Sequence, residues 1–354
     1  MGNFIDELLA KKAVFLEDKS TTKGVVISTR IRLARNLADF NFPGTAAVEQ
    51  LKSISQAVLA TSLKNKIFGR FKVYQLFPEE IDEIDKGILL ERRLISKEFV
   101  QRKEGNLLLL KSNEQASVMV NEEDHLRIQV IKPGFNLEKA YEEIVQIDER
   151  LAQELPYAFS ERLGYLTSCP SNVGTGMRAS VMVHLPGLVK DGKMEQIIRS
   201  LKNLQLAVRG FWGEGSENVG DFFQISNQVT LGESEEVTLK HLSETIEDII
   251  EQELLARKNL VESKNDLILD TIGRAYGILN YCHILSYKEA LELASNLRLG
   301  VNLGFLESIS LEDVNNFLLN MGQAYLTKKS LNSASLAIDC DVKRAALARE
   351  IFVK

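Results

Sequence analysis

Apolar and polar residues alternate with a period of two in several stretches of the first 235 residues, which is the pattern of strands with one buried face. The four clearest stretches are VISTRIRL (26–33), EDHLRIQV (123–130), MRASVMVHL (177–185) and LQLAVRG (204–210). Shorter apolar runs bounded by turns occur at FKVYQLF (71–77), within GNLLLLKSNEQASVMV (105–120) and at DFFQISNQVTLG (221–232). Strands joined by such short turns predict a largely antiparallel sheet.

Other stretches repeat their apolar residues at helical spacing. Residues 47–65, 136–155 and 193–203 predict helices that flank the sheet. The fold predicted for residues 1–235 is therefore α+β, an antiparallel sheet flanked by helices.

After Gly232 the alternation stops, and residues 235–282 predict a long helical region. Capping-box patterns at SYKE (286–289) and SLED (310–313) each predict the start of another helix. We therefore expect residues 236–354 to form an all-helical C-terminal domain.

Composition narrows the class of protein. A net charge of −6 argues against nucleic-acid binding through bulk positive charge. The sequence contains no run of eighteen apolar residues and therefore predicts no membrane-spanning helix. The N-terminal stretch MGNFIDELLAKK has no apolar signal core, so we expect a cytoplasmic protein without direct membrane contact. Three cysteines without a CxxC pair fit a reducing compartment, and four histidines far apart in the sequence predict no metal site built by the protein.

Four of the predicted strands carry arginine on the face opposite their apolar residues. The five side chains are Arg30, Arg32, Arg127, Arg178 and Arg209. For any one strand the simpler interpretation is a solvent-facing surface, where charged residues are common. Four such strands together favour an anion site. A solvent-exposed surface without a binding role would carry lysine and glutamate as well, whereas arginine predominates here. Planar guanidinium groups bind phosphate oxygens in pairs, so this set predicts a cradle for a triphosphate.

The loop SCPSNVGTGMRAS (168–180) lies beside one of these arginines and holds Gly174 and Gly176. It matches neither a GxxxxGK[ST] phosphate loop nor the GxGxxG dinucleotide pattern. The two glycines are about as consistent with a simple turn as with backbone N–H groups that approach an anion.

Cys169, in the same loop, precedes Pro170 and is therefore biased towards extended backbone. A buried, unreactive thiol is the commoner fate of a cysteine, but a thiol among several arginines is expected to ionise. Two acids are candidates to flank a substrate nitrogen: Glu123 within VNEEDH, on the arginine-bearing face, and Glu214 within GEGSE. Acid runs in turns are more often solvated, so both interpretations stay open from the residues alone.

Four segments, taken in order, resemble those of a known family. STRIRLARN, NEEDHLRI, CPSNVGTGMRAS and VRGFWGEGSE are similar to the signature segments of the ATP:guanidino phosphotransferases, or phosphagen kinases. The resemblance covers roughly residues 20–235 and implies the catalytic fold of that family, which is similar to that of glutamine synthetase. As a whole the chain resembles the bacterial protein-arginine kinase branch (McsB type). ISNQVTLGESEE and GRAYGILNYC are similar to that branch, and the small helical N-terminal domain of phosphagen kinases is expected to be absent.

The resemblance implies a binding site for ATP, with Mg²⁺ held mainly through the ATP phosphates. The residues that it implies for nucleotide binding are Ser28, Thr29, Arg30, Ile31, Arg32, Arg93, Arg127, Arg178, Ala179, Ser180, Val181, Met182, Arg209, Gly210, Phe211, Trp212 and Gly213. It further implies Glu123 as catalytic base, Glu214 as the second carboxylate, and Cys169 as a thiolate that binds the guanidinium without a covalent bond.

The implied activity is transfer of the ATP γ-phosphoryl group to arginine residues of proteins, in stress response and in marking proteins for degradation. The implied partners are protein substrates with exposed arginines, a Clp-type AAA+ unfoldase, an activator protein, a stress-gene repressor and a second copy of the chain in a homodimer. The C-terminal domain is then a dimerisation or docking domain.

The sequence departs from the family pattern at two places. Arg93 stands where the family usually has a nucleotide-contacting histidine. CDVKRA (340–345) stands where the RDxxRA motif of a phosphoarginine-sensing pocket is expected, so that Asp341 and Arg344 remain but Cys340 replaces an arginine.

Two other functions are open from sequence. The first is a kinase for free arginine or another small guanidine, which the missing N-terminal domain argues against. The second is a non-catalytic adaptor on a kinase fold, which the full set of arginines, acids and cysteine argues against.

Overall fold

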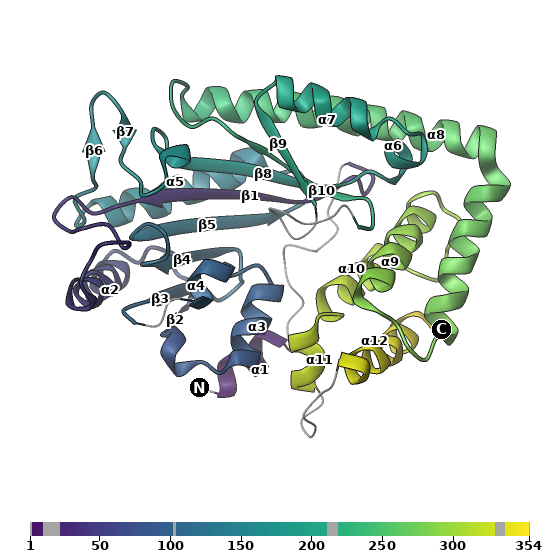
Figure 1. The fold of residues 1–354 in the computed structure, drawn as a ribbon, viewed down its shortest axis with the longest axis horizontal. Coiled ribbons are helices and arrows are strands. Elements are labelled where there is room, and N and C mark those ends of the chain that lie inside the picture. The colour runs from purple at the N-terminus through teal and green to yellow at the C-terminus, as the bar shows by residue number, and fades with distance from the viewer. Residues whose placement is uncertain (1, 10–21, 102–103, 211–218, 330–336, 354) are drawn as a thin grey trace.

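The computed structural model of the chain describes residues 2–9, 22–101, 104–210, 219–329 and 337–353. Within these residues the centre is an eight-stranded sheet in the order β2-β3-β4-β5-β1-β8-β10-β9, and every neighbouring pair is antiparallel (Figure 1). Its strands are β1 (Val26–Arg35), β2 (Val73–Leu76), β3 (Leu107–Lys111), β4 (Ala116–Val120), β5 (Leu126–Pro133), β8 (Met177–His184), β9 (Leu206–Gly210) and β10 (Phe222–Asn227). A separate hairpin precedes β8 and consists of β6 (Phe159–Ser160) and β7 (Gly164–Tyr165). The predicted antiparallel sheet is confirmed.

Helices cover one face of the sheet, here called the back face, and form the main core with it. They are α2 (Val48–Lys64), α5 (Leu137–Ala152), α7 (Met194–Asn203) and the first half of α8 (Glu235–Tyr281). Apolar residues of these helices, such as Ile144 and Leu242, share the core with strand residues such as Ile31 and Val181. Strand alternation therefore puts the residues next to them in sequence, Arg30 and Arg32 among them, on the opposite front face.

The front face is covered at its two ends and not in its middle. At one end α1 (Gly2–Leu9), α3 (Glu83–Glu91) and α4 (Lys97–Gln101) form a small core with front-face residues of β3 and β4 such as Leu108 and Met119. At the other end Met182 and Phe222 are buried with the C-terminal helices. The polar middle of the sheet is thus left between two packed regions.

The C-terminal helices follow a bend in the 47-residue helix α8, at the non-helical backbone of Lys264 (φ −140°, ψ 33°) (Figure 1). Beyond the bend lie α9 (Tyr287–Asn302), α10 (Leu311–Asn320), α11 (Gln323–Lys329) and α12 (Ala337–Phe352). The Oγ of Ser286 accepts a hydrogen bond from the Glu289 N–H, and Ser310 and Asp313 form a reciprocal capping box, so both predicted helix starts are confirmed. Neither α8 nor any other helix in the described ranges is long and apolar enough to cross a membrane.

The two cores share α8. The sheet core extends along this helix as far as Ala256, whereas the C-terminal core includes α8 residues from Ala275 to Leu279. α6 (Pro186–Lys190) is fixed to the middle of α8, because the Glu253 carboxylate accepts hydrogen bonds from the backbone N–H groups of Gly187 and Leu188, both at 2.9 Å. The division predicted at residue 235 stays a prediction, and the packing adds that the first half of α8 is buried with the sheet.

This packing gives a stability prediction. Leu242→Ala removes a fully buried side chain from the sheet core, so the free energy of unfolding is expected to fall by about 2–5 kcal/mol. Leu255→Ala on the same helix changes a side chain that is 58% exposed, and its effect is expected to stay within about 0.5 kcal/mol. Urea unfolding of both variants measures the difference. Equal effects would contradict the assignment of this half of α8 to the core.

Candidate active site

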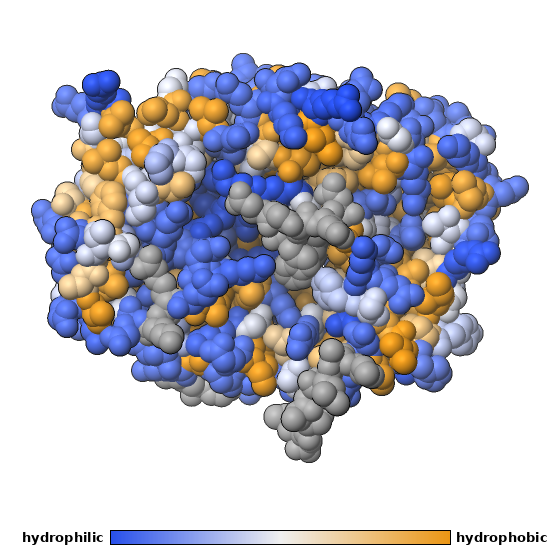
Figure 2. Space-filling model, viewed as in Figure 1, coloured by the Kyte–Doolittle hydropathy of each residue, from blue (hydrophilic) through white to orange (hydrophobic). Residues whose placement is uncertain are grey.

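Two adjoining cavities lie over the middle of the front face. The first cavity has a volume of about 530 Å³ and the second cavity about 370 Å³. Four side chains line both cavities: Arg32, Arg127, Arg209 and Glu98. In the view of Figure 2, hydrophilic side chains gather around the hollow over the middle of the sheet. Three arginines therefore stand at the boundary between the two cavities.

The two cavities differ in their other residues. The first cavity is also lined by acids, a cysteine, an arginine, and residues of β1 and of the loop that precedes β8: Leu33, Ala34, Glu122, Glu123, Asp124, Cys169, Ser171, Asn172, Gly176 and Arg178. The second cavity is also lined by cationic, amide and apolar side chains together with one acid: Arg30, Leu90, Glu91, Arg93, Ile95, Ser96, Lys97, Met119, Gln129 and Gln224. The structure thus brings the five predicted arginines, Glu123 and Cys169 to one place, and their individual roles stay predictions.

Strand register explains why the arginines meet. On β1, Arg32 lies opposite Arg178 of β8 on one side and opposite Gln129 of β5 on the other. Arg30 lies opposite Ser180, and its Nη2 donates a hydrogen bond to Gln224 Oε1 of β10 at 3.1 Å. Directly opposed residues of neighbouring strands point to the same face, so the register alone gathers these side chains.

The clustered guanidinium groups disfavour one another's charge. Burial, followed by the charges of Arg93, Arg127, Arg178 and Arg209, lowers the pKa of Arg30 to about 9. Burial and the neighbouring arginines also hold the pKa of Arg32 well below its ordinary value. The Nε of Arg32 is buried without a hydrogen-bond partner among the described residues. An anion bound between the arginines would offset this repulsion and supply such a partner.

Not every residue of the predicted nucleotide segments faces the cavities. Thr29, Ile31, Ala179 and Val181 alternate with the arginines and are buried towards the back face, because adjacent strand residues point to opposite faces. The Thr29 hydroxyl, for example, donates to the Gly134 carbonyl at 2.8 Å.

The remaining predicted nucleotide residues fall into three groups: front-face residues, one residue at the end of a strand, and residues outside the described ranges. Ser28, Ser180 and Met182 do lie on the front face, beside Arg30 in a small recess that also includes Arg93. Gly210 ends β9 and lines neither cavity. The predicted residues Phe211, Trp212, Gly213 and Glu214 lie outside the described residues.

Arg93 lines the second cavity together with Arg30 and Glu91. Burial lowers its pKa to about 10, and its backbone has φ 59°, which is uncommon for a residue other than glycine. Its carbonyl accepts a hydrogen bond from Gln129 Nε2 at 2.9 Å. The position that departs from the family pattern is therefore held at the wall of the cavity.

Glu122 is a site residue that the sequence interpretation missed. Its side chain is buried, pairs with Arg127 and accepts a hydrogen bond from the Ser96 hydroxyl. Burial acts to raise the pKa of this carboxyl, but the charge and hydrogen bonds of Arg127 and Ser96 outweigh it and hold the pKa below its ordinary value. In the sequence, Glu122 is the first of three consecutive acids, and this run was the signal that could have identified it. Strand alternation selected only the following residue, Glu123. Glu122 keeps a negative charge beside one of the shared arginines.

Glu123 lies in the loop between β4 and β5 and is exposed, whereas the alternation predicts it within a strand. Partial burial, with the neighbouring charges of Asp124 and Glu122, raises the pKa of its carboxyl, and Arg127 opposes this effect. The prediction that it reaches the arginine-bearing side is supported, since Glu123 lines the first cavity with Arg32 and Arg127. A carboxylate with a raised pKa beside cations suits a proton acceptor.

Strand alternation over residues 123–130 predicts His125 on the same side as Glu123, but its ring is fully buried. The Nδ1 accepts a hydrogen bond from the Leu37 N–H at 3.0 Å, and Nε2 lies 3.0 Å from the Asn41 carbonyl oxygen. The strand begins only at Leu126, so the alternation does not extend back to this residue.

Asp124 joins the Glu123 loop to the Cys169 loop. Its Oδ1 accepts hydrogen bonds from Asn36 Nδ2 and from the Ser168 N–H, both at 2.6 Å. The Ser168 hydroxyl in turn donates to the Glu123 carbonyl at 2.8 Å. These bonds hold the two loops together on one wall of the first cavity.

Cys169 is half-buried, and its Sγ lies 3.0 Å from the Ser171 hydroxyl oxygen. It directly precedes a short 3₁₀ turn (Pro170–Asn172), and its extended backbone (φ −94°, ψ 123°) agrees with the bias set by the following proline. The Thr230 hydroxyl fixes the loop by donating to the carbonyls of Ser171 and Val173, at 3.0 and 2.7 Å. The thiol is thereby presented to the first cavity by a loop with little freedom.

Asp341 and Arg344 lie on α12 and line neither cavity. Arg344 is buried, and it donates hydrogen bonds to the carbonyls of Met321 and Leu285, both at 2.8 Å, and to Asp341 Oδ1 at 2.5 Å. In this arrangement the two residues join the start of α9 to the end of α10. A regulatory role for them stays a prediction.

No group of three or more His, Cys, Asp or Glu side chains within the described ranges is arranged to hold a metal ion. Of the acids that line the first cavity, Glu122 pairs with Arg127, and Asp124 accepts hydrogen bonds that join two loops.

Two family models match the chain. The model described as "ATP:guanido phosphotransferase, C-terminal catalytic domain" matches residues 51–256. The model described as "Protein-arginine kinase McsB C-terminal domain" matches residues 265–354. The two matches meet near the bend in α8.

Similar proteins are named in the same way. The chain is 43% identical over 337 residues to a protein-arginine kinase of Syntrophomonas wolfei, covering 94% of this chain and 93% of that protein. It is 40% identical over 339 residues to a protein-arginine kinase of Geobacillus stearothermophilus, covering 96% and 93%.

Solved structures of a lombricine kinase and a taurocyamine kinase share the fold. A lombricine kinase superposes with a TM-score of 0.58 at 25% identity, covering 69% of this chain and 70% of that chain. The duplicated taurocyamine kinase of Schistosoma mansoni, solved with components of a transition-state analogue, gives a TM-score of 0.58 at 26% identity. That match covers 69% of this chain and 34% of the longer, duplicated chain. From these matches, and from the arginine-walled cavities on its antiparallel sheet, the chain belongs to the protein-arginine kinase family of ATP:guanido phosphotransferases.

Proposed function

We propose that this protein transfers the γ-phosphoryl group of MgATP to a guanidino nitrogen of arginine residues in proteins. One observation carries the proposal: two cavities meet at a shared wall that holds Arg32, Arg127 and Arg209. Glu98 lines both cavities as well. A phosphoryl group that passes between two bound molecules needs cations at the boundary, because its three oxygens carry the negative charge of the transition state.

The second cavity is the proposed site for the nucleotide. Arg30 and Arg93 join the shared arginines there, while Met119 and Ile95 offer apolar contact for a base. Mg²⁺ would arrive on the ATP phosphates as part of the substrate, which agrees with a site richer in guanidinium groups than in free carboxylates.

The first cavity is the proposed site for the arginine acceptor. A guanidinium is protonated at neutral pH and is a poor nucleophile until a base takes a proton from it. Glu123 is exposed to this cavity and has a raised pKa, so we assign it the role of base. Cys169 lines the same cavity and would hold the guanidinium by charge. Glu214, the second carboxylate that the sequence predicts, keeps that proposed role.

Proteins are the proposed acceptors because the similar proteins are named protein-arginine kinases and the chain carries the C-terminal domain of that group. We further propose cytoplasmic action as a homodimer, with an activator protein, a stress-gene repressor and a Clp-type unfoldase as partners. Exposed apolar side chains after the bend of α8, such as Leu267 at 61% and Tyr281 at 80%, support a docking or dimerisation surface there.

An acceptor assay tests the proposed function. The protein is incubated with MgATP and either an arginine-rich protein or free arginine, and acid-labile phosphate on arginine is identified by mass spectrometry. Phosphoarginine is expected in the protein and not in the free amino acid. Phosphorylation of free arginine alone would assign a small-guanidine kinase, and no transfer to either would support a non-catalytic protein.

Glu123→Gln tests the base. Loss of the carboxylate is expected to lower kcat by about 10²–10⁴-fold while MgATP still binds, because the phosphate-binding groups are separate from the base. Isothermal titration with MgATP and an assay of phosphoarginine formation measure the two properties. Glu161→Gln, at an exposed acid of the β6–β7 hairpin, is the matched control and should keep wild-type activity. Wild-type turnover in the Glu123→Gln variant would contradict the assignment of Glu123 as the base.

The raised pKa of Glu123 also predicts a pH dependence. The base must be ionised to accept a proton, so kcat/KM is expected to fall on the acidic side with an apparent pKa above that of an ordinary glutamate. A pH profile at saturating MgATP measures this limb. An acidic limb at or below the ordinary value would contradict the role of this carboxylate.

Cys169→Ser tests the thiolate. A charge-assisted contact to the guanidinium is worth about 1.5–3 kcal/mol, so kcat/KM for the acceptor is expected to fall by roughly 10–150-fold. Cys282→Ser, in the C-terminal part, is the control and should stay near wild type. No phosphorylated cysteine is expected in the wild-type protein during turnover, and trapping one by mass spectrometry would overturn the non-covalent role.

A further inference from the structure

Arg35 is a buried arginine of β1 that lies on the back face of the sheet, opposite the face that carries the two cavities. It lies three residues after Arg32, so strand alternation places it on the back face with Ile31 and Leu33. Its residue exposure is 1%. A buried guanidinium is costly unless its charge and its N–H groups are all engaged, so its contacts indicate what it is there to hold.

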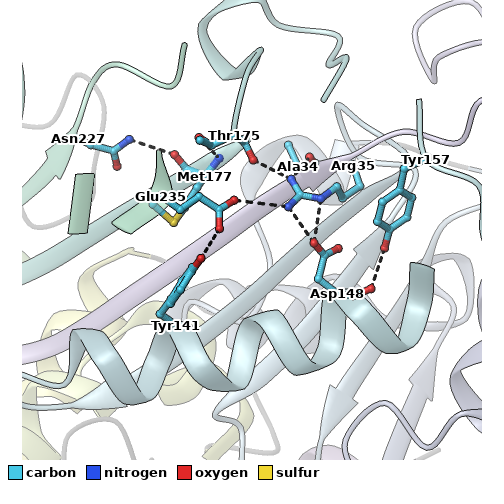
Figure 3. Close-up of polar contacts among 9 residues, drawn as sticks. All are labelled: Ala34, Arg35, Tyr141, Asp148, Tyr157, Thr175, Met177, Asn227 and Glu235. Atoms are coloured by element: carbon cyan, nitrogen blue, oxygen red, sulfur yellow. Dashed lines mark hydrogen bonds and ion pairs between the residues drawn. The ribbon is translucent and has the colours of Figure 1, made fainter. Parts of the chain in front are cut away.

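The guanidinium is engaged on several sides (Figure 3). Its Nε and Nη2 donate to Asp148 Oδ2 of α5, at 3.0 and 2.8 Å, and Nη2 lies 3.9 Å from Glu235 Oε1 at the start of α8. Its Nη1 donates to the Thr175 carbonyl at 2.9 Å and to the carbonyl of its neighbour Ala34 at 3.0 Å. Its plane lies over the ring of Tyr165, 3.5 Å from the ring centroid.

The carbonyl that Arg35 holds belongs to the Cys169–Gly176 loop. Thr175 lies between Gly174 and Gly176, both with positive φ (111° and 64°), and Gly176 lines the first cavity. A Cβ on Gly176 would lie 2.6 Å from the Ala34 carbonyl oxygen and 2.7 Å from Arg35 Nη1. The loop therefore rests directly on the guanidinium, with no space between them.

The other end of the network is anchored to two helices. Glu235 accepts a hydrogen bond from the Tyr141 hydroxyl of α5 at 2.7 Å, and the Asp148 carbonyl accepts one from the Tyr157 hydroxyl at 3.3 Å (Figure 3). Arg35 thus connects α5 and the start of α8 to the loop that presents Cys169. It reaches the cavity wall from behind the sheet.

We propose that Arg35 is a positioning residue for the arginine acceptor, which fixes the Cys169–Gly176 loop without touching either substrate. The inference rests on the proposed function and deepens it. The loop lines only the first cavity, through Cys169, Ser171, Asn172 and Gly176, and none of these residues lines the second. Disturbing the support of the loop therefore affects the acceptor and leaves nucleotide binding intact.

Arg35→Lys is the test. Lysine keeps a charge for Asp148 but has no planar fork that reaches the acid and the Thr175 carbonyl together. A displacement of reacting groups by about 1 Å can cost about 10²-fold, so kcat/KM for the protein acceptor is expected to fall by about 10–100-fold. The Kd for MgATP, measured by titration calorimetry, is expected to match that of the wild type.

Arg257→Lys is the matched control. Arg257 is also a buried arginine that pairs with an acid, Glu253, and donates to the carbonyls of Lys23 and His184, but it lines neither cavity. The Arg257→Lys variant is expected to have a lowered melting temperature, as Arg35→Lys does. Its KM and kcat, measured on the folded fraction, are expected to stay at wild-type values. A merely structural role for Arg35 predicts the same behaviour for both variants.

A second pair of variants tests the contact from the loop side, and decides the matter if Arg35→Lys fails to fold. Gly176→Ala forces a Cβ against Arg35 and the Ala34 carbonyl, whereas Gly192→Ala has a similar positive φ (71°) and no atom within 4 Å of the added Cβ. Only Gly176→Ala is expected to reduce kcat/KM for the acceptor with an unchanged Kd for MgATP.

The outcomes separate the inference from the proposed function. An acceptor defect confined to Arg35→Lys and Gly176→Ala supports the inference. It is overturned if Arg35→Lys behaves like Arg257→Lys, if Gly176→Ala behaves like Gly192→Ala, or if the Kd for MgATP weakens along with the acceptor kinetics. A wild-type protein that forms no phosphoarginine would instead overturn the proposed function.

Discussion

Guanidinium groups that repel one another are held together at the centre of the candidate site. The central strands place several arginines side by side on the front face, and burial with mutual repulsion lowers the pKa of Arg30 and Arg32. A flexible surface would let such groups separate. Here the antiparallel ladder fixes their backbones, and the packed back face prevents the strands from moving apart. An anion bound between these groups would relieve their mutual repulsion.

Residues around the arginine cluster hold the walls of the two cavities in place. Glu122 pairs with Arg127 at the wall of the first cavity, while Asp124 and the Ser168 hydroxyl join the Glu123 loop to the Cys169 loop. The C-terminal helices take part as well. Glu91 lines the second cavity, and its carboxylate accepts hydrogen bonds from the Ala324 and Tyr325 N–H groups at 2.8 and 3.1 Å. The C-terminal helices are therefore bonded to the wall of the cavity assigned to the nucleotide.

The sequence predicted those features that depend on local periodicity. Strand alternation put Arg30 and Arg32 on one face and assigned arginines of the other strands to the same side, and helix caps at Ser286 and Ser310 marked where helices begin. Alternation does not extend into the loop before β5: Glu123 still reaches the first cavity, but His125 is buried instead of facing it.

The sequence interpretation also missed residues whose role depends on distant parts of the chain. Glu122 acquires its role from Arg127 and Ser96, and Arg35 from an acid of α5 and a loop carbonyl 140 residues away. No spacing rule joins such positions before the fold does. The only local sign for Arg35 was a charged residue at a core position of a strand.

We propose that the arginines shared by the two cavities bind the phosphoryl group while it is transferred. The most direct measurement is the diffraction structure of the protein with MgADP, nitrate and an arginine-containing peptide, because planar nitrate resembles a phosphoryl group in a loose transition state. Nitrate is expected among Arg32, Arg127 and Arg209. ADP is expected in the second cavity, and the peptide guanidinium in the first cavity within hydrogen-bond reach of Glu123. Nucleotide phosphates bound away from these arginines, or a guanidinium on the other side of them, would contradict this proposal.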